Sequence, residues 1–338
     1  ASKRTTPESS DLQALSAVMR ERHMRNLVME VSSHAIALER IRGSHFAVVA
    51  FTNLTQDHLD FHKTMENYFA AKSKLFTFEF ADLAVINIDD AYGVKLAEQT
   101  ELPVMTVSRH DHNATWHYVS INRDYVGAHV AIRGSAGILI EGKVHLHGGY
   151  NFDNLLMAVA IATESGIDPI DIAAILPQLT GAAGRLEAVR LGQNFTALVD
   201  YAHSPDAVSR VLETAHEITD GRVIAVLGCG GDRDSTKRPL MGKALHDGAD
   251  VAIFTSDNPR SEKPEAILVQ MTLGLDIQEP SAIIEDRAEA IRAAVNEAQE
   301  GDVVIVLGKG HEKGQDIAGV NHPFDDRVEL AKAIEDKK

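Results

Sequence analysis

The sequence predicts an α/β protein in which helices alternate with the strands of mostly parallel sheets. Short apolar runs of strand length recur along the chain, and stretches with helical periodicity separate them. Nearly every apolar run also ends in polar residues, as in α/β proteins that bind ligands at the carboxyl ends of their strands. The 338 residues are enough for two domains.

The first half of the chain predicts a mostly parallel sheet and a small antiparallel sheet. The expected parallel strands are residues 27–31, 46–54 and 83–88. The expected helices are residues 65–78, 151–165 and 169–179. Residues 116–147 alternate apolar and polar positions around glycine-containing turns, which indicates an antiparallel ribbon.

The second half alternates more regularly, which predicts a Rossmann-like doubly wound domain. Its expected strands are residues 196–200, 222–228, 250–256, 281–285 and 302–307. Its expected helices are residues 205–218, 238–248, 265–275, 288–299 and 326–336. We therefore predict two domains, residues 1–187 and residues 188–338.

Composition argues against several classes of protein. The net charge of −16, from 33 basic and 49 acidic residues, argues against a nucleic-acid partner, because such partners are bound by basic patches. The single cysteine, Cys229, excludes an internal disulfide and a zinc site built from several cysteines. The sequence has no run of about 18 apolar residues and no signal peptide, so we expect a cytoplasmic protein without a membrane partner.

Lys72 occupies an unusual position on the expected helix 65–78. It shares a face with Tyr68, Leu75 and Phe76, where the pattern asks for an apolar residue. Its amine could reach water along an apolar stem. Alternatively, burial could lower its pKa, so that the neutral amine reacts with carbon dioxide to give a carbamate, an anionic metal ligand.

Glu30 and His58 are the other candidate metal ligands of the first half. Glu30 ends an apolar run, and His58 follows the next expected strand. Either residue alone could be a structural hydrogen-bonding partner. With a carbamylated Lys72 they would form an oxygen and nitrogen ligand set suited to Mg²⁺.

Two loops of the second half are candidates for binding anions. Residues 228–239, GCGGDRDSTKRP, are glycine-rich and lie between a strand and a helix, as an anion-binding loop does. Residues 257–264, DNPRSEKP, place Arg260 among acidic and amide side chains after another strand. The glycine-rich loop fits neither a P-loop nor a dinucleotide-binding fingerprint, and no Walker A sequence occurs in the chain.

Nine motifs, in order along the chain, resemble those of the Mur ligases of peptidoglycan synthesis, and in particular the branch that adds meso-diaminopimelate. They are TTPES (5–9), EVSSHAI (30–36), NLTQDHLDFHKTMENYFAAKSKLF (53–76), YNFDNLLMA (150–158), GRLE (184–187), VDYAHSPDA (199–207), LGCGGDRDSTKRPLMG (227–242), DNPRSE (257–262) and GKGHE (308–312). The resemblance implies a central ATPase domain followed by an amino-acid-binding domain. The family's P-loop, G-T-N-G-K-T, and its UDP-binding domain would precede TTPES, so we expect an incomplete and poorly active enzyme.

The resemblance implies an ATP-dependent ligase that adds meso-diaminopimelate to UDP-N-acetylmuramoyl-L-alanyl-D-glutamate. ATP would phosphorylate the terminal carboxylate, and the amine of diaminopimelate would attack the resulting acyl phosphate. The implied cofactors are ATP, two Mg²⁺ ions and N6-carboxylysine at Lys72. We expect the protein to be a monomer.

The motifs also carry the family's functional positions onto this sequence. The implied metal ligands are Glu30, His58 and Lys72. The implied muramoyl-peptide positions are Thr5, Thr6, Ser32, Arg40 and Lys72, with Leu38 standing where a polar contact is expected. The implied nucleotide-binding positions are Asn151, Asn154, Arg185, Asp200, Tyr201 and His203. The implied catalytic positions are Lys72, His203 and Lys237.

The implied diaminopimelate-binding positions are Arg233, Asp257, Asn258, Arg260, Gly308 and Glu312. Diaminopimelate has a second amino-carboxylate centre that lysine lacks, and Arg260 could bind its carboxylate through two parallel hydrogen bonds. Asp257 or Glu312 could accept from the distal ammonium. We therefore expect the DNPR loop to select diaminopimelate over lysine.

Three alternatives remain open at this point. A truncated fragment of the ligase could bind the amino acid and catalyse nothing. A metal-dependent hydrolase could use Glu30 and His58, although the chain lacks a dense motif of histidines and aspartates. A ligase like folylpolyglutamate synthetase would share the ATPase architecture, but TTPES and DNPRSE count against it.

Overall fold

The structure, a computed structural model, describes residues 5–55, 59–124 and 126–337. Its contacts divide the chain into two compact units. The first unit contains residues 1–120, 131–141 and 153–174, and the second contains residues 121–130, 142–152 and 175–338. Both are built from strands and helices in alternation, which confirms the α/β class. Within the described ranges, no helix is both long and apolar enough to cross a membrane.

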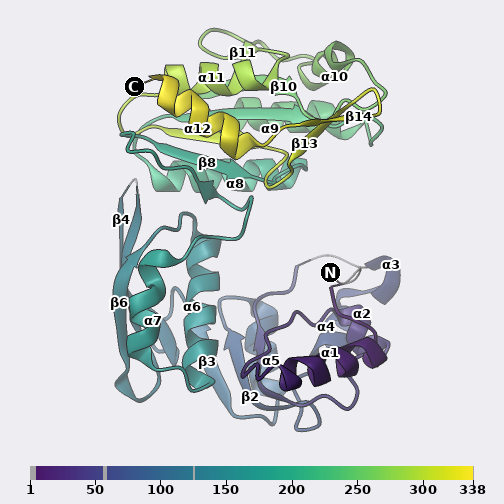
Figure 1. Cartoon of the computed structure of the whole chain (residues 1–338), viewed down its shortest axis with the longest axis vertical. Helices are drawn as coiled ribbons and strands as arrows, with labels where there is room; N and C mark the ends of the chain where they lie inside the picture. The colour runs from purple at the N-terminus through teal and green to yellow at the C-terminus, as the bar shows by residue number, and fades with distance from the viewer. Residues whose placement is uncertain (1–4, 56–58, 125, 338) are drawn as a thin grey trace. The chain divides into compact units, whose positions relative to one another are not determined.

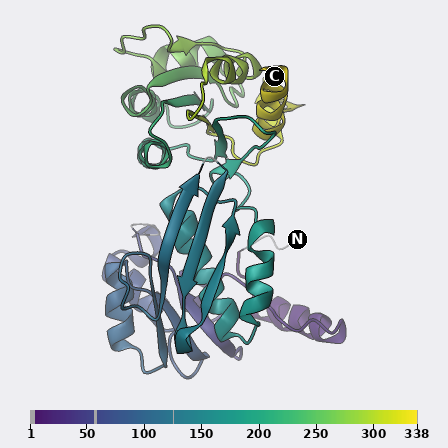
Figure 2. The same ribbon diagram turned by 90° about the vertical axis from the view of Figure 1, so that its left-hand side faces the viewer.

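Six strands form the first sheet, in the order β1-β2-β3-β4-β5-β6. They are β1 (Phe46–Phe51), β2 (Ala81–Asn87), β3 (Val104–Ser108), β4 (Trp116–Asp124), β5 (Gly127–Arg133) and β6 (Leu139–Val144). The pairs from β1 to β4 are parallel. Figure 2 shows the strands of the segment 116–144 lying side by side. The ribbon expected there therefore continues the first sheet and does not form a separate one.

Seven helices of the first half are described, and side chains cap several of them, including α2, α4 and α5. They are α1 (Ser9–Glu21), α2 (Ser33–Ala37), α3 (Leu59–His62), α4 (Met65–Ser73), α5 (Ala91–Gln99), α6 (Gly149–Glu164) and α7 (Pro169–Ile175), with 3₁₀ turns η1 (Ser135–Gly137) and η2 (Leu176–Gln178). Thr64 accepts a hydrogen bond from the backbone of α4, and Asp90 accepts two from α5. Apolar residues of α1, α4 and α5 share one buried cluster with β1 and β2.

Residues 27–31 differ from the expectation, because the structure has no strand there and Val28 is 90% exposed. The Thr6 hydroxyl holds the end of this segment instead. It donates to Glu30 O and accepts from Ser32 N, both at 3.0 Å. An apolar run becomes a strand only when another strand pairs with it, and composition does not reveal that partner.

The second sheet has the order β11-β10-β9-β12-β8-β7. Its strands are β7 (Glu187–Ala188), β8 (Thr196–Asp200), β9 (Val223–Cys229), β10 (Val251–Ser256), β11 (Ala282–Ile283) and β12 (Val303–Leu307). All pairs are parallel except β7 with β8. A hairpin of β13 (Gly314–Ile317) and β14 (Val320–Pro323) follows as a separate antiparallel pair.

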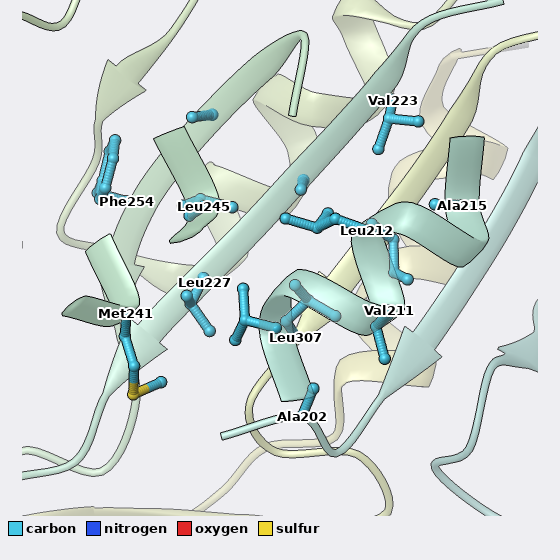
Figure 3. Close-up of a cluster of buried hydrophobic side chains, with 14 of the residues drawn as sticks. Ala202, Val211, Leu212, Ala215, Val223, Leu227, Met241, Leu245, Phe254 and Leu307 are labelled. Carbon is cyan, nitrogen blue, oxygen red and sulfur yellow. The ribbon is translucent and has the colours of Figure 1, made fainter. Parts of the chain in front are cut away.

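Helices cover both faces of the second sheet, as expected for a doubly wound domain. They are α8 (Pro205–Ile218), α9 (Lys237–Gly248), α10 (Pro264–Met271), α11 (Arg287–Glu297) and α12 (Asp326–Lys337). Residues of α8, α9 and α10 pack in one buried cluster, part of which Figure 3 shows. Residues of α11 and α12 pack in another, and Figure 1 shows these two helices next to each other. Every residue of β9 is therefore buried, which is typical of a parallel strand covered on both faces.

Candidate functional site

The carboxyl ends of β9, β10 and β12 carry the two loops and the GKGHE motif of the second half. In the sheet, β9 lies between β10 and β12. Parallel strands that neighbour one another end at the same edge, so the residues that follow them meet there. The contacts described below join Asp257, Asn258, Arg260, Gly308 and Glu312 at this edge, which is the candidate amino-acid pocket.

Glycines let the ends of these strands approach one another. Gly308 has φ +110°, and a Cβ atom there would lie 2.7 Å from Asp257 Oδ2. At Gly228, a Cβ atom would lie 2.7 Å from Thr255 O and 2.8 Å from Asp257 N. Side chains at these two positions would push Asp257 away, so the glycines of the LGCGG and GKGHE motifs have a steric role.

Asn258 connects the loop after β10 to the loop after β12. Its Nδ2 donates to Glu312 Oε2 at 3.0 Å. Its Oδ1 accepts from Asp316 N at 2.9 Å and from Lys309 Nζ at 3.1 Å. Asn258 is buried and Glu312 is half-buried, so this amide joins the Glu312 carboxylate to the loop after β10.

Arg260 is held in place by its backbone and by its side chain. Its φ of +52° lies in the left-handed region, which is unfavourable for residues other than glycine. Arg260 N donates to Asp316 O at 2.9 Å, and Ala318 N donates to Arg260 O at 2.7 Å. Nη1 donates to Gly231 O at 2.6 Å. A guanidinium anchored through one nitrogen keeps other N–H groups with which it can bind a carboxylate.

Arg238 and Glu262 tie the glycine-rich loop to the loop that carries Arg260. Arg238 is buried at the start of α9 and donates to both carboxylate oxygens of Glu262. It also donates to Gly230 O at 3.0 Å, while Asp232 N donates to Glu262 at 2.6 Å. The glycine-rich loop is therefore ordered by an ion pair. Arg233, which we expected in the pocket, is exposed on this loop.

A fully buried ion pair, Arg287 with Asp326, lies at the ends of β10 and β12. Both of its hydrogen bonds are 2.7 Å long. Arg287 also donates to Ser256 O and Leu307 O, which are the last residues of these two strands. Burial raises the pKa of the neighbouring Asp257, and the positive charges of Arg287 and Lys309 oppose that rise.

Five of the six expected nucleotide-binding residues lie in the second unit. Asn151 Nδ2 donates to Arg185 O at 3.4 Å, and the Arg185 guanidinium lies 5.4 Å from the centroid of the Tyr201 ring. The Tyr201 and His203 rings are 4.6 Å apart. The exposed Arg185 and His203 suit phosphate groups, and the half-buried Tyr201 offers a ring face, so these residues fit a nucleotide.

Asp200 organises the backbone beneath this group. It is buried at the end of β8, accepts from Leu186 N and Ala202 N at 2.8 Å, and lies 3.3 Å from the Tyr150 hydroxyl. Burial raises the pKa of Asp200, although the two backbone bonds oppose the rise. Two further expected residues are exposed: Asn154 on α6 in the first unit, and Lys237 at the start of α9.

Three of the expected muramoyl-peptide positions meet in the first unit. Ser32 caps α2 and donates its backbone N–H to Thr6, which is buried. Arg40 Nη1 lies 3.5 Å from Thr6 O, and Arg40 Nε lies 3.2 Å from Glu8 Oε2. Thr5 is exposed, and so is Leu38, at the position where a polar contact was expected.

The metal-binding prediction rests on residues that the structure describes only in part. Lys72 is half-buried on α4, and its Nζ lies 5.4 Å from the centroid of the Tyr68 ring. Tyr68, Leu75 and Phe76 are buried as expected, but α4 ends at Ser73, so the helix is shorter than the expected 65–78. Leu75 and Phe76 follow it in turns, in which Leu75 N donates to Lys72 O and Phe76 N to Ser73 O. Glu30 is exposed, and His58 lies outside the described residues. In the part of the chain that is described, no three His, Cys, Asp or Glu residues gather as metal ligands. The ligand set therefore remains a prediction, for which Glu30 offers an oxygen donor that suits Mg²⁺.

Sequence reasoning missed three buried charges around the amino-acid pocket: Lys309, Arg287 and Arg238. Each follows an apolar strand or begins a helix, where a charged residue usually faces water. The one feature of the sequence that could have identified them is their position after strands whose ends carry polar residues. Which carboxylate each of them would pair with depends on contacts between distant parts of the chain.

Comparisons with known proteins identify the family to which both halves of the chain belong. Residues 1–162 match the Mur ligase middle domain, and residues 184–310 match the glutamate ligase domain of Mur ligases. The UDP-N-acetylmuramoyl-L-alanyl-D-glutamate--2,6-diaminopimelate ligase of Streptomyces coelicolor is 48% identical over 343 residues, covering 98% of this chain and 67% of that protein. The chain thus spans about two thirds of the length of this relative.

One solved structure gives the same family, and another shows the same fold. The structure of a UDP-N-acetylmuramoyl-L-alanyl-D-glutamate--2,6-diaminopimelate ligase is 37% identical, with a TM-score of 0.78, covering 98% of this chain and 69% of that one. A folylpolyglutamate synthase from Mycobacterium tuberculosis is 19% identical, with a TM-score of 0.54, covering 78% of this chain and 61% of that one. That second likeness is one of fold alone. The domains, the motifs and the identity to the diaminopimelate ligases together show that this chain belongs to the Mur ligase family.

Proposed function

We propose that the chain takes part in the ATP-dependent addition of meso-diaminopimelate to UDP-N-acetylmuramoyl-L-alanyl-D-glutamate, a step of peptidoglycan precursor synthesis. The observation that carries this proposal is the amino-acid pocket of the second unit. There, Arg260 is anchored to Gly231 O, and Asn258 is hydrogen-bonded to Glu312. The name of the Streptomyces coelicolor relative supports the same substrate.

The pocket offers complementary charges to the distal end of diaminopimelate. Arg260 can bind the distal carboxylate, because only one of its N–H groups is needed for the 2.6 Å bond to Gly231 O. Glu312 uses Oε2 for its bond to Asn258, which leaves Oε1 for the distal ammonium. Lysine has that ammonium but no distal carboxylate, so it would leave Arg260 unpaired and would bind more weakly.

We assign the other predicted site residues to the nucleotide, the metal ion and the muramoyl peptide, which take part in the phosphoryl transfer that precedes amide formation. ATP supplies the phosphoryl group that activates the substrate carboxylate, and Mg²⁺ offsets the repulsion between that carboxylate and the triphosphate. We expect Arg185, Tyr201 and His203 to hold the nucleotide, with Lys237 close to its phosphates.

Glu30, His58 and a carbamylated Lys72 would hold one Mg²⁺. Thr6, Ser32 and Arg40 would hold the muramoyl peptide. We also expect a cytoplasmic monomer.

The test measures phosphate release and product mass with ATP, Mg²⁺, the UDP-linked dipeptide and either meso-diaminopimelate or L-lysine. Because the chain contains no Walker A sequence, we expect slow formation of the amide product with diaminopimelate and still less with lysine. Equal use of lysine would contradict the proposed role of Arg260. Binding of diaminopimelate without phosphate release would favour the alternative in which this chain retains only amino-acid binding. Phosphoester hydrolysis without ATP would favour the hydrolase.

A further inference from the structure

Lys309 is a buried charge to which the motifs assign no role. It follows Gly308 after β12, and its side chain is 0% exposed. Its Nζ lies 3.1 Å from Asn258 Oδ1 and 3.1 Å from Glu312 Oε2. Lysine is almost never fully buried unless it is paired. Both of its partners belong to the proposed amino-acid pocket.

Lys309 fixes the direction in which the Asn258 amide faces. Asn258 Oδ1 accepts from two donors, Lys309 Nζ and Asp316 N. Turning the amide over would place its NH₂ group against an ammonium and a backbone N–H, which are both donors. Asn258 is therefore held with Nδ2 toward Glu312, and the second hydrogen of Nδ2 can serve a ligand.

Lys309 also acts on Glu312. Burial alone would raise the pKa of Glu312, but hydrogen bonds from Asn258 and Lys309 outweigh it and hold that pKa below its usual range. Both bonds use Oε2, so the carboxylate stays ionised with Oε1 available to a cation.

We propose that Lys309 is the positioning residue of the amino-acid pocket, which orients Asn258 and Glu312 to receive the distal ammonium of a diamino acid. This inference rests on the proposed function, since it concerns the same pocket. The alternative is that Lys309 only ties the loop after β12 to the loop after β10. In that case its removal would destabilise the fold, and it would weaken binding to the same extent whether or not Glu312 is present.

The experiment titrates the 338-residue chain with meso-diaminopimelate by calorimetry and compares it with Lys309→Met and Lys313→Met. Methionine keeps the length of the stem and removes the charge. We expect Lys309→Met to raise Kd by roughly 10- to 100-fold, the effect of losing one charge-assisted partner. Lys313 is exposed on the same loop, so Lys313→Met should leave Kd unchanged. An unchanged Kd in Lys309→Met would overturn the inference.

A double-mutant cycle separates positioning from a structural role. If Lys309 acts through Glu312, Lys309→Met should weaken binding much less in a Glu312→Gln background than in the unmodified chain. Additive losses would assign Lys309 to structure and overturn the inference. Absence of binding by the unmodified chain would overturn the proposed function, and this inference with it.

Thermal unfolding of each variant controls for folding. Lys309→Gln keeps an N–H donor for one of the two acceptors, so it should fold and show a smaller rise in Kd than Lys309→Met. If Lys309→Met does not fold, the cycle is run with Lys309→Gln. If neither variant folds, Lys309 serves stability and the inference is overturned.

Discussion

Arg238 and Glu262 form a bidentate ion pair, with Nη1 2.8 Å from Oε2 and Nη2 2.7 Å from Oε1. Arg238 belongs to the glycine-rich motif, and Glu262 is the last residue of the DNPRSE motif. Because Gly231 of the first motif also accepts from Arg260 of the second, each loop holds the other in place. The two motifs are therefore one structural unit, although 24 residues separate the paired charges.

We expect Glu262→Gln to lower Tm at neutral pH and to have little effect in strong acid. Hydrogen bonds from Arg238 and from Asp232 N lower the pKa of Glu262 from its usual 4.5 to about 2. A carboxylate with a lowered pKa stabilises the fold fully above its unfolded pKa, and this contribution is lost as the pH falls from about 4.5 toward about 2. Tm measured for both proteins across this range checks the prediction. Glu300→Gln, at an exposed glutamate, is the control and should leave Tm unchanged. If the Tm difference between Glu262→Gln and the unmodified chain does not shrink in acid, the prediction is wrong.

The central strands of the second sheet, β8, β9, β10 and β12, could be predicted because they are buried throughout. Every residue of β9 and of β12 is buried, so these strands appear in the sequence as continuous apolar runs that end at glycine or a polar residue. Residues 27–31 gave a similar signal and are not a strand, since pairing depends on a neighbour that composition does not show.

The residues of the candidate site were proposed from motifs, and physical reasoning alone would not have selected them. The residues of DNPR and GKGHE meet at one sheet edge as the alternation of strands and helices implies. The buried partners that order them could not be predicted. Arg287 pairs with Asp326 at a separation of 39 residues, and Lys309 contacts Asn258 at a separation of 51. Whether a charge is buried depends on such contacts, which only the folded chain defines.

We expect Arg260→Lys to raise the KM for meso-diaminopimelate by roughly 10- to 100-fold while leaving the KM for ATP nearly unchanged. A lysine ammonium cannot donate two parallel bonds to a carboxylate, and it would also have to replace the bond to Gly231 O. The φ of +52° is equally unfavourable for arginine and lysine, so the backbone should not change. Steady-state kinetics with each substrate varied in turn is the measurement. Equal increases in both KM values would remove Arg260 from amino-acid recognition.

We expect Gly308→Ala to weaken diaminopimelate binding and to destabilise the fold more than Gly319→Ala does. Both glycines have positive φ, +110° and +80°, so each substitution strains the backbone, by roughly 1–2 kcal/mol for a left-handed residue. Only at Gly308 would the new Cβ also meet a side-chain atom, Asp257 Oδ2 at 2.7 Å, whereas nothing lies within 4 Å at Gly319. Calorimetric binding and denaturant unfolding of both variants test this. Equal loss of binding in the two would show that the contact with Asp257 has no role in the pocket.

We expect Lys72→Ala to abolish ligase turnover and short carboxylates such as acetate to restore part of it. Lys72 is half-buried beside Tyr68 on α4, so its removal leaves a space that a small carboxylate can enter. Restoration would follow only if the lysine acts as a carbamate, because an added carboxylate replaces an anion and not an ammonium.

The control is Lys74→Ala, which removes an exposed lysine two positions further along and so tests for loss of charge on this segment. Phosphate release with and without acetate is the measurement. Loss of turnover that acetate does not reverse would favour a cationic Lys72 at the phosphates, and unchanged turnover would exclude Lys72 from the mechanism.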